Sequence, residues 1–271
     1  MDIPPMPKRS PEYSIVVPAY NERLRIAASL GRILDFLSAQ RWDAEVLVVN
    51  DGSKDDTAAI VASRAQADPR VRLLENPGNR GKGYSVRNGM LHARGELLFF
   101  TDADLSSPVE EVVKLAAAIR AGADVAIGSR WLRPEMMSER QPLARQFMGR
   151  SFNLFMHLSL GLRFKDTQCG LKAFTRRAAL EIFPRQHIER WGFDGELLFL
   201  AARLGLQVAE VPVAWAHDDR SKIHPIQDGV QMVKEALQVR WFAIRGRYRR
   251  PVFPPQTDDS ADAAASETPQ K

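Results

Sequence analysis

The stretch Leu97-Leu98-Phe99-Phe100-Thr101-Asp102-Ala103-Asp104 joins a short apolar run directly to a pair of acidic residues. An apolar run of this length is typical of a buried strand in an α/β sheet. Ligands of open α/β sheets bind at the carboxyl ends of the strands, which is where Asp102 and Asp104 follow. Two carboxylates that flank one small residue can share Mg²⁺ or Mn²⁺ with a diphosphate. The stretch therefore predicts an enzyme that uses a nucleotide-diphosphate donor.

Short apolar runs rich in β-branched residues recur on both sides of this stretch, with helical patterns between them. We expect strands at Tyr13–Val17, Glu45–Val49, Val71–Leu74, Leu97–Phe100, Ala123–Ile127 and Gln207–Val213. Apolar residues with a period near 3.6 predict helices over residues 24–37, 57–67, 109–119, 141–162 and 196–204. This alternation predicts an α/β fold with a mainly parallel, doubly wound sheet.

Two sequence signatures mark where helices begin. Ser107, Pro108 and Glu110 fit a capping box with proline in the first helical position. Ser53 and Asp56 repeat the S-x-x-D signature before the helix over residues 57–67. We therefore expect the hydroxyl groups of Ser107 and Ser53 to cap the helices that follow them.

The composition is that of a soluble globular protein, with 45% hydrophobic and 26% charged residues among 271. The single cysteine, Cys169, excludes an internal disulfide framework and fits a reducing compartment. We expect it to be buried rather than nucleophilic. The sequence contains no apolar run of about 18 residues, so it predicts no membrane span. Its first residues lack the apolar core of a signal peptide. These features predict a cytoplasmic protein.

The net charge of +5 is concentrated near the C-terminus, where we expect an amphipathic basic helix over about residues 226–250. Its apolar stripe contains Val230, Val233, Leu237, Trp241 and Ile244. That stripe can pack on its own domain, or it can lie in a membrane interface. We expect one domain over residues 12–250, between a flexible N-terminus (residues 1–11) and a disordered tail (residues 251–271).

Further polar clusters follow other expected strands at the same sheet edge. The first strand leads into Pro18-Ala19-Tyr20-Asn21-Glu22, and the second into Asn50-Asp51-Gly52-Ser53. An aromatic ring there can stack on a base, and a carboxylate can accept hydrogen bonds from a nucleoside. The structural alternative is that Asn21 and Asp51 only shape turns and caps. The stretch 78–83, which contains Gly81 and Lys82, suits a phosphate because glycines let backbone N–H groups approach an anion.

Two later residues are candidates for contacts with the donor. Arg130 follows the expected strand Ala123–Ile127, and a guanidinium can bind phosphate oxygens in bidentate fashion. Asp194 either caps the helix that follows it or acts as an acid facing the donor. His217 and His224 lack the spacing of metal ligands, so neither is expected to bind one.

These clusters, in their order along the chain, resemble the sequence markers of glycosyltransferase family 2. The markers are Pro18–Glu22, Asn50–Ser53, Arg80–Gly83, Asp102–Asp104 and Gly128–Arg130. Within that family, Asp166–Thr175, Ile188–Asp194 and Ser221-Lys222 are similar to the dolichyl-phosphate β-glucosyltransferases. The resemblance covers residues 13–245 and implies a GT-A fold. It also implies inverting transfer of a hexose, glucose from UDP-glucose above all, to a polyprenyl or dolichyl phosphate.

The resemblance implies roles for individual residues. The nucleotide sugar would be bound by Pro18, Ala19, Tyr20, Glu22, Val49, Asp51, Gly81, Lys82, Asp102 and Ala103. Mg²⁺ or Mn²⁺ would be held by Asp102 and Asp104. The catalytic residues would be Asp104, Arg130, Asp194 and Lys222, with Arg130 and Lys222 on the donor or acceptor phosphate. A lipid-linked acceptor further implies peripheral attachment to the cytoplasmic face of a membrane.

Two departures bear on the choice of donor. Mannosyl relatives often carry a glutamine where this chain has Ser106 and an arginine where it has Ala216, so both departures favour glucose. The alternatives are GDP-mannose as donor, or a soluble or polysaccharide acceptor that needs no basic amphipathic tail. Binding of nucleic acid by the C-terminal arginines is not expected, because it would leave the acidic pair without a purpose.

Overall fold

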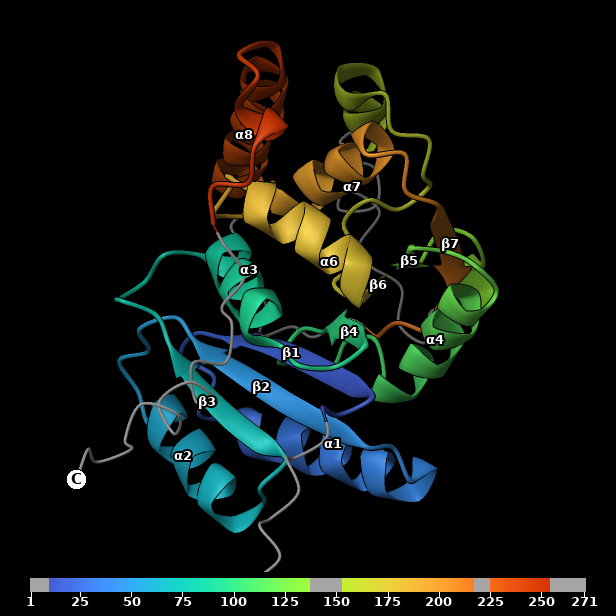
Figure 1. The fold of residues 1–271 in the computed structure, drawn as a ribbon. Coiled ribbons are helices and arrows are strands. Elements are labelled where there is room, and N and C mark those ends of the chain that lie inside the picture. Colours follow the sequence, from blue (N-terminus) through green and yellow to red (C-terminus); the bar gives the residue numbers. More distant parts are fainter. Residues whose placement is uncertain (1–9, 137–152, 217–224, 254–271) are drawn as a thin grey trace, which may run out of the picture.

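The computed structural model describes residues 10–136, 153–216 and 225–253, and in the last segment it describes side chains from residue 229 onward. Within these residues, a seven-stranded sheet has the order β3-β2-β1-β4-β6-β5-β7 (Figure 1). Its strands are β1 (Tyr13–Ala19), β2 (Ala44–Asn50), β3 (Val71–Glu75), β4 (Leu97–Phe100), β5 (Val125–Ser129), β6 (Lys172–Thr175) and β7 (Val208–Pro212). The pairs are parallel except those of β6 with β4 and β5. This confirms the expected mainly parallel sheet.

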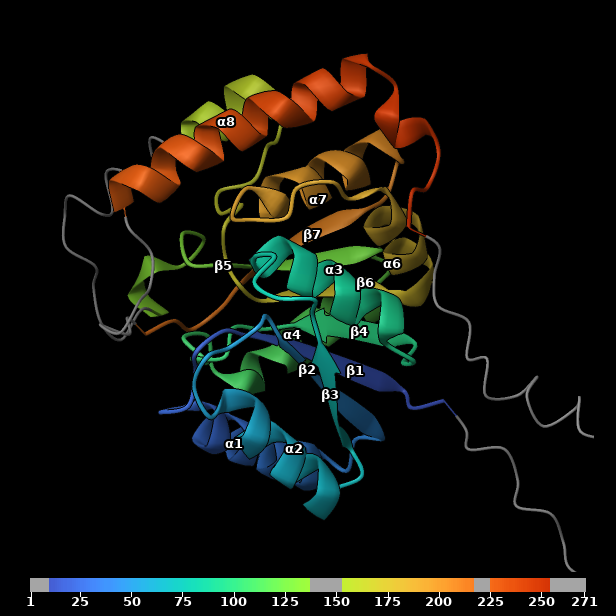
Figure 2. The same cartoon turned by 90° about the vertical axis from the view of Figure 1, so that its left-hand side faces the viewer.

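Helices cover both faces of the sheet. One layer contains α1 (Ile26–Gln40), α2 (Thr57–Ala67) and α4 (Val112–Arg120), and the other contains α3 (Lys82–His92), α6 (Arg176–Ile182) and α7 (Phe193–Arg203) (Figure 2). Successive residues of a strand point to opposite faces, so Val16 joins the core under α3, whereas Ile15 and Val17 join the core under α1. Because both faces are buried, the strands read as continuous apolar runs.

Strand β6 is not predicted by the sequence pattern, because it is only four residues long and begins with a lysine. It lies antiparallel between β4 and β5, with Lys172 opposite both Phe100 and Ile127. An antiparallel strand begins at the edge where its parallel neighbours end. The residues before β6 (166–171) are therefore brought to the same edge as the acidic pair.

The expected cap at Ser107 is wrong. Pro108 has an extended backbone, so a 3₁₀ turn at Val109–Glu111 precedes α4 and no side chain caps either one. Ser107 Oγ lies 3.9 Å from Cys169 Sγ instead. The hydroxyl thus joins two loops of the sheet edge, and Cys169 is buried as the sequence predicts.

The expected cap at Ser53 is wrong for a similar reason. Ser53 Oγ accepts a hydrogen bond from Asn21 N at 2.9 Å, which joins the loops after β1 and β2. The N–H of Thr57 at the start of α2 is instead bound by Asp55 Oδ1 at 3.0 Å.

Helix α8 (Pro225–Ile244) packs on α7, but its expected apolar stripe does not face the domain. Its buried side chains among the described residues are Glu235, Ala236, Val239 and Phe242. The stripe is exposed at Val230, Leu237, Trp241 and Ile244, with Trp241 at 52% and Ile244 at 78%. The alternative that this stripe packs on its own domain is therefore wrong. The helix also ends before residue 250, because Gly246 adopts a left-handed φ of 71° and a short 3₁₀ turn follows.

The chain beyond α8 returns to the domain. Val252 N and Phe253 N donate hydrogen bonds to Pro184 O at 2.7 and 3.1 Å. The Arg87 guanidinium lies 3.9 Å from the centre of the Phe253 ring. The expected disordered tail (251–271) is therefore wrong for its first three residues.

Several sequence-based expectations concern residues outside the described ones. These are the flexible N-terminus up to residue 9, the tail from residue 254, and residues 141–152 of the helix expected over 141–162. Residues 153–160 of that helix are described and helical. No helix in the described ranges combines the length and apolarity that crossing a membrane requires.

Candidate active site

Asp102 and Asp104 lie just beyond the carboxyl end of β4, as the sequence predicts. The backbone turns sharply there, because Leu105 N donates to Asp102 O at 3.1 Å and Leu105 adopts a left-handed φ of 50°. Ser106 N donates to Asp104 Oδ1 at 2.9 Å and orients that carboxylate. Burial, and then the negative charge of Asp102, raise the pKa of Asp104 above its ordinary value. A cation bound to this pair would relieve the repulsion.

The donor set fits a hard divalent cation. Asp102 and Asp104 offer carboxylate oxygens, and Mg²⁺ is usually bound through one or two carboxylates, with waters and substrate phosphates completing its shell. The described part of the chain holds no group of three or more histidine, cysteine, aspartate or glutamate side chains that could bind a metal by themselves. The acidic pair therefore suits a metal that binds together with a diphosphate.

Lys82 lies against the acidic pair, with its Nζ atom 2.5 Å from Asp102 Oδ1. Gly170 packs on the same carboxylate, since a Cβ atom at this position would stand 2.0 Å from Asp102 Oδ2. Burial alone would lower the pKa of Lys82, but the charges of Asp102 and Asp194 outweigh burial and raise that pKa. The ammonium group is therefore charged and fixed at the edge of the predicted diphosphate site.

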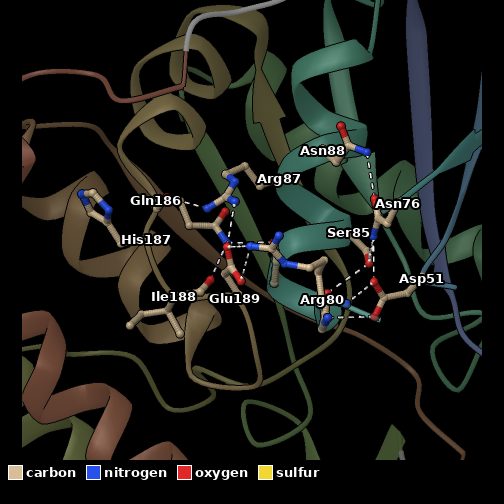
Figure 3. Close-up of polar contacts among 12 residues, drawn as sticks. Asp51, Asn76, Arg80, Ser85, Arg87, Asn88, Gln186, His187, Ile188 and Glu189 are labelled. Carbon is tan, nitrogen blue, oxygen red and sulfur yellow. Dashed lines mark hydrogen bonds and ion pairs between the residues drawn. The ribbon is translucent and has the colours of Figure 1, made fainter. Parts of the chain in front are cut away.

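The loop that carries Lys82 is fastened to Asp51 at the end of β2 (Figure 3). Asp51 Oδ1 accepts hydrogen bonds from Arg80 N at 2.9 Å and Asn76 Nδ2 at 2.8 Å, and Oδ2 accepts one from Gly81 N at 2.8 Å. These two backbone N–H groups bind a carboxylate of the protein, which contradicts their expected approach to a phosphate. Asp51 thus shapes this turn, while its contact with a nucleoside stays a prediction.

Residues 186–190 hold the other side of the same loop (Figure 3). Glu189 forms ion pairs with Arg80 at 3.0 Å and with Arg87 at 3.3 Å. A Cβ atom at Gly81 would lie 2.5 Å from Glu189 O, so the two segments approach more closely than another residue would allow. Lys82 is therefore positioned from both sides.

Glu196, a fully buried carboxylate of α7, holds residues 186–190 in turn. It accepts hydrogen bonds from His187 N at 2.9 Å, Ile188 N at 2.8 Å and the Tyr248 hydroxyl at 2.7 Å. Burial raises the pKa of Glu196 to about 7. Through Tyr248, the turn that follows α8 is joined to the segment beside the active site.

Arg130 follows β5 as expected, but one edge of its guanidinium is bound by Asp166. Arg130 Nε lies 2.7 Å from Asp166 Oδ2, and Nη2 lies 2.9 Å from Oδ1. Burial alone would raise the pKa of Asp166, but the charge and hydrogen bonds of Arg130 outweigh it and hold that pKa below its ordinary value. The bidentate pair orients the Arg130 guanidinium, while its contact with a phosphate stays a prediction.

Asp194 lies in the first turn of α7, buried against Lys172. Lys172 Nζ lies 2.5 Å from Asp194 Oδ1 and donates to Cys169 O at 2.7 Å. Burial raises the pKa of Asp194, and the charges of Lys172 and Lys82 oppose that rise. The helix-cap role considered for Asp194 is wrong, because Gly192 is the N-cap residue and no side chain caps it.

The other residues predicted for the nucleoside end of the site lie at the ends of β1 and β2 or shortly after β1. Pro18 and Ala19 end β1, Tyr20 follows it, and Glu22 forms an ion pair with Arg25. Val49 is fully buried in β2, where it packs against Gly89, so only its backbone is left for a nucleoside. Lys222 lies outside the described residues.

Sequence reasoning assigned no role to Asp166, Lys172 or Glu196. Lysine is almost never fully buried unless it is paired, so a lysine between apolar residues gives no sign of its place. Glu196 has the appearance of an ordinary acidic residue in the first turn of a helix. Only the resemblance of Asp166–Thr175 to known sequences directs attention to the first two.

Solved glycosyltransferase structures share this fold. Glucosyl-3-phosphoglycerate synthase from Mycobacterium tuberculosis, solved with Mn²⁺, UDP and glucosyl-3-phosphoglycerate, aligns with 89% of this chain and 81% of its own, with a TM-score of 0.61 and 20% identity. Mannosyl-3-phosphoglycerate synthase from Rubrobacter xylanophilus aligns with 93% of this chain and 80% of its own, with a TM-score of 0.64 and 18% identity. The fold is the GT-A fold that the sequence predicts.

Similar sequences extend over most of the chain. A dolichyl-phosphate beta-glucosyltransferase from Trichomonas vaginalis is 40% identical over 237 residues, which cover 83% of this chain and 70% of that protein. One from Dictyostelium discoideum is 35% identical over 249 residues, which cover 87% of this chain and 76% of that protein. Residues 14–183 match the glycosyl transferase family 2. The chain therefore belongs to glycosyltransferase family 2, where it is an enzyme similar to the dolichyl-phosphate β-glucosyltransferases.

Proposed function

We propose that this enzyme transfers glucose from UDP-glucose to dolichyl phosphate or another polyprenyl phosphate, with inversion at C1 of the sugar. The observation that carries the proposal is the 40% identity to a dolichyl-phosphate beta-glucosyltransferase over 83% of the chain. That similarity extends well beyond the residues 14–183 that define the family. The GT-A fold alone does not distinguish a lipid acceptor from a soluble one.

The proposed reaction is a single in-line displacement. An oxygen of the acceptor phosphate forms a bond to C1 while the bond from C1 to the UDP oxygen breaks, and UDP leaves with that electron pair. The acceptor phosphate is already anionic at neutral pH, so the protein need not supply a strong base. Catalysis would then depend on positioning the reactants and on stabilising charge.

On the donor side, Asp102 and Asp104 would hold Mg²⁺ or Mn²⁺. When bound, such a cation acts as a Lewis acid on the diphosphate of the leaving group. Lys82, fixed 2.5 Å from Asp102 Oδ1, would add a second positive charge beside that diphosphate. Residues 18–22 and Asp51 would form the nucleoside end of the site, with the ring of Tyr20 as a stacking surface.

On the acceptor side, Arg130 and Lys222 would bind phosphate. The two hydrogen bonds of Arg130 to Asp166 would keep its guanidinium in one orientation. Asp194 would orient the sugar or the acceptor through Oδ2, because its Oδ1 atom is bound by Lys172.

We further propose that the enzyme attaches peripherally to the cytoplasmic face of a membrane, where a lipid acceptor would be found. Six exposed large apolar side chains lie on only two helices, residues 153–160 and α8. This apolar face consists of Leu154, Leu158, Val230, Leu237, Trp241 and Ile244. Both helices lie at the end of the molecule opposite α1 and α2 (Figures 1 and 2). The described segment after residue 229 also contains six basic residues and one acidic residue, which favours contact with anionic lipid.

The test is a transfer assay with purified enzyme and Mg²⁺ or Mn²⁺. Labelled UDP-glucose and GDP-mannose are each offered with dolichyl phosphate and, separately, with 3-phosphoglycerate. We expect label in the organic phase only with UDP-glucose and dolichyl phosphate. A water-soluble product with 3-phosphoglycerate would instead assign a soluble acceptor, and transfer from GDP-mannose would assign the other donor.

A further inference from the structure

A groove of about 520 Å³ lies outside the active site, where α7, α8 and the helix over residues 153–160 meet. Its apolar lining includes Leu160, Phe199, Ala243 and Ile244, and its polar lining is Arg203 and Arg240. Ile244 belongs both to the groove and to the apolar face defined above, so the two surfaces are continuous. A ligand of this groove would therefore be reached from the side of the molecule that carries the exposed apolar residues.

The two arginines of the groove come from different helices. Arg203 ends α7 and Arg240 lies in the second half of α8, and both are exposed. Neither forms an ion pair with an acidic residue among those that the structure describes. A basic residue in the last turn of α7 also stabilises the helix dipole, but that accounts for Arg203 alone. Two guanidinium groups at one apolar groove have the chemistry to bind a phosphate that carries an apolar chain.

The groove is distinct from the site for the acceptor phosphate. Asp194, at the start of α7, lies beside Lys172 in the active site, and Arg203 ends the same helix. A helix of 11 residues separates its ends by about 15 Å. One phosphate cannot contact both places. A phosphate bound in the groove would therefore belong to a second molecule and not to the acceptor in the active site.

We propose that the groove binds an anionic phospholipid, with Arg203 and Arg240 on the lipid phosphate and the apolar lining on the adjoining part of the lipid. The proposal rests on the proposed function, which places the enzyme at a membrane. A lipid held there would hold the Arg203 end of α7 at the membrane surface, which is the end of that helix opposite Asp194. The groove would thus add an oriented contact to the general attraction of a basic surface.

The test measures binding of the full chain to vesicles of phosphatidylcholine, with and without phosphatidylglycerol, by flotation. The double variant Arg203→Gln/Arg240→Gln is compared with Arg249→Gln/Arg250→Gln, which removes the same charge from exposed positions outside the groove. General attraction predicts the same loss of binding in both. We expect the loss of vesicle binding to be about tenfold larger for the groove variant than for the control. This difference is the effect of the hydrogen bonds that Arg203 and Arg240 would donate to the charged lipid phosphate. Thermal unfolding of both variants verifies that they are folded.

Three results would overturn the proposal. Equal losses in the two variants would leave only general electrostatics, and equal binding of wild type to both kinds of vesicle would exclude an anionic lipid. Release of the wild type by inorganic phosphate, at an ionic strength matched with chloride, would assign the groove to a free phosphate. Flotation needs neither donor nor acceptor, so this result stands apart from the transfer assay and the two proposals can fail separately.

Discussion

Lys82 Nζ lies 2.5 Å from Asp102 Oδ1, so one carboxylate of the proposed metal site already has a cation of the protein beside it. A lysine and a metal ion at the same carboxylate repel each other. Replacing Lys82 with methionine should therefore tighten binding of Mn²⁺ in the absence of nucleotide, by about tenfold for a change of about 1.4 kcal/mol. The same change should weaken binding of UDP in the presence of Mn²⁺.

Electron paramagnetic resonance of free Mn²⁺ and calorimetry of UDP binding measure the two effects. Lys114→Met is the matched control, because Lys114 of α4 pairs with Glu111 of the preceding 3₁₀ turn and not with the acidic pair. Weaker binding of Mn²⁺ to Lys82→Met, or the same change in the control, would contradict the proposed arrangement.

Gly170 touches the same carboxylate through its backbone. A Cβ atom at residue 170 would stand 2.0 Å from Asp102 Oδ2, so Gly170→Ala must displace the carboxylate. We expect Mn²⁺ to bind about tenfold more weakly in the presence of UDP. This is the effect of losing one contact to a charged group, here the contact of the Asp102 carboxylate with the metal. Gly31→Ala is the control, because a Cβ atom there meets nothing within 4 Å. Unchanged binding in Gly170→Ala would show that Asp102 does not need this position.

Lys172 and Asp194 form a buried pair, with Lys172 Nζ 2.5 Å from Asp194 Oδ1. Removing one partner of such a pair leaves a buried charge without compensation, which costs about 3–5 kcal/mol. Lys172→Met should lower the free energy of unfolding in urea by that amount, and Lys172→Met with Asp194→Asn should recover part of the loss. The single variant Asp194→Asn completes the comparison. If the double variant lost as much free energy of unfolding as the two single variants together, or more, the pairing assigned to Lys172 and Asp194 would be wrong.

Glu196 makes the stability of the protein depend on pH. Burial raises its pKa to about 7 in the folded state, above the value of 4.5 for an exposed glutamate. Between these values the folded state binds more protons than the unfolded state. The favourable contribution is therefore complete below pH 4.5 and is lost as the pH rises through about 7, by about 3 kcal/mol in all.

Urea unfolding between pH 5 and pH 8 tests this dependence. Glu196→Gln cannot titrate, so its free energy of unfolding should fall less with rising pH than that of the wild type. Its stability at any one pH is lower for another reason, because the amide NH₂ would face backbone N–H donors at His187 and Ile188. The comparison therefore concerns the slope with pH, and equal slopes would falsify the assignment.

Local apolar pattern is sufficient to predict the parallel part of this fold and the place of the acidic pair. Strand β4 has the predicted bounds, Leu97–Phe100, and Asp102 and Asp104 follow it at the carboxyl edge. The strands are buried on both faces, so their apolar runs are continuous and easily recognised. Parallel strands also end at one edge, which is why the loops after β1, β2 and β4 could be expected together.

The remainder of the site depends on contacts between residues distant in sequence. Lys172 is buried only because β6 lies between β4 and β5, and its partner Asp194 comes from a helix that starts 18 residues after β6 ends. The hydroxyl of Ser53 binds Asn21 N, 32 residues away, in place of the local cap. The apolar stripe of α8 has a helical period whichever side it presents, so periodicity alone cannot distinguish a buried from an exposed stripe.

The most direct measurement compares wild type and Asp104→Asn in transfer of labelled glucose from UDP-glucose to dolichyl phosphate at saturating Mn²⁺. We expect an organic-extractable product from the wild type that EDTA abolishes, and a rate at least about 100-fold lower for the variant. The variant should unfold at the same temperature or higher, because burial and the charge of Asp102 already disfavour ionised Asp104. Full turnover by Asp104→Asn, or no lipid product from the wild type, would contradict the account.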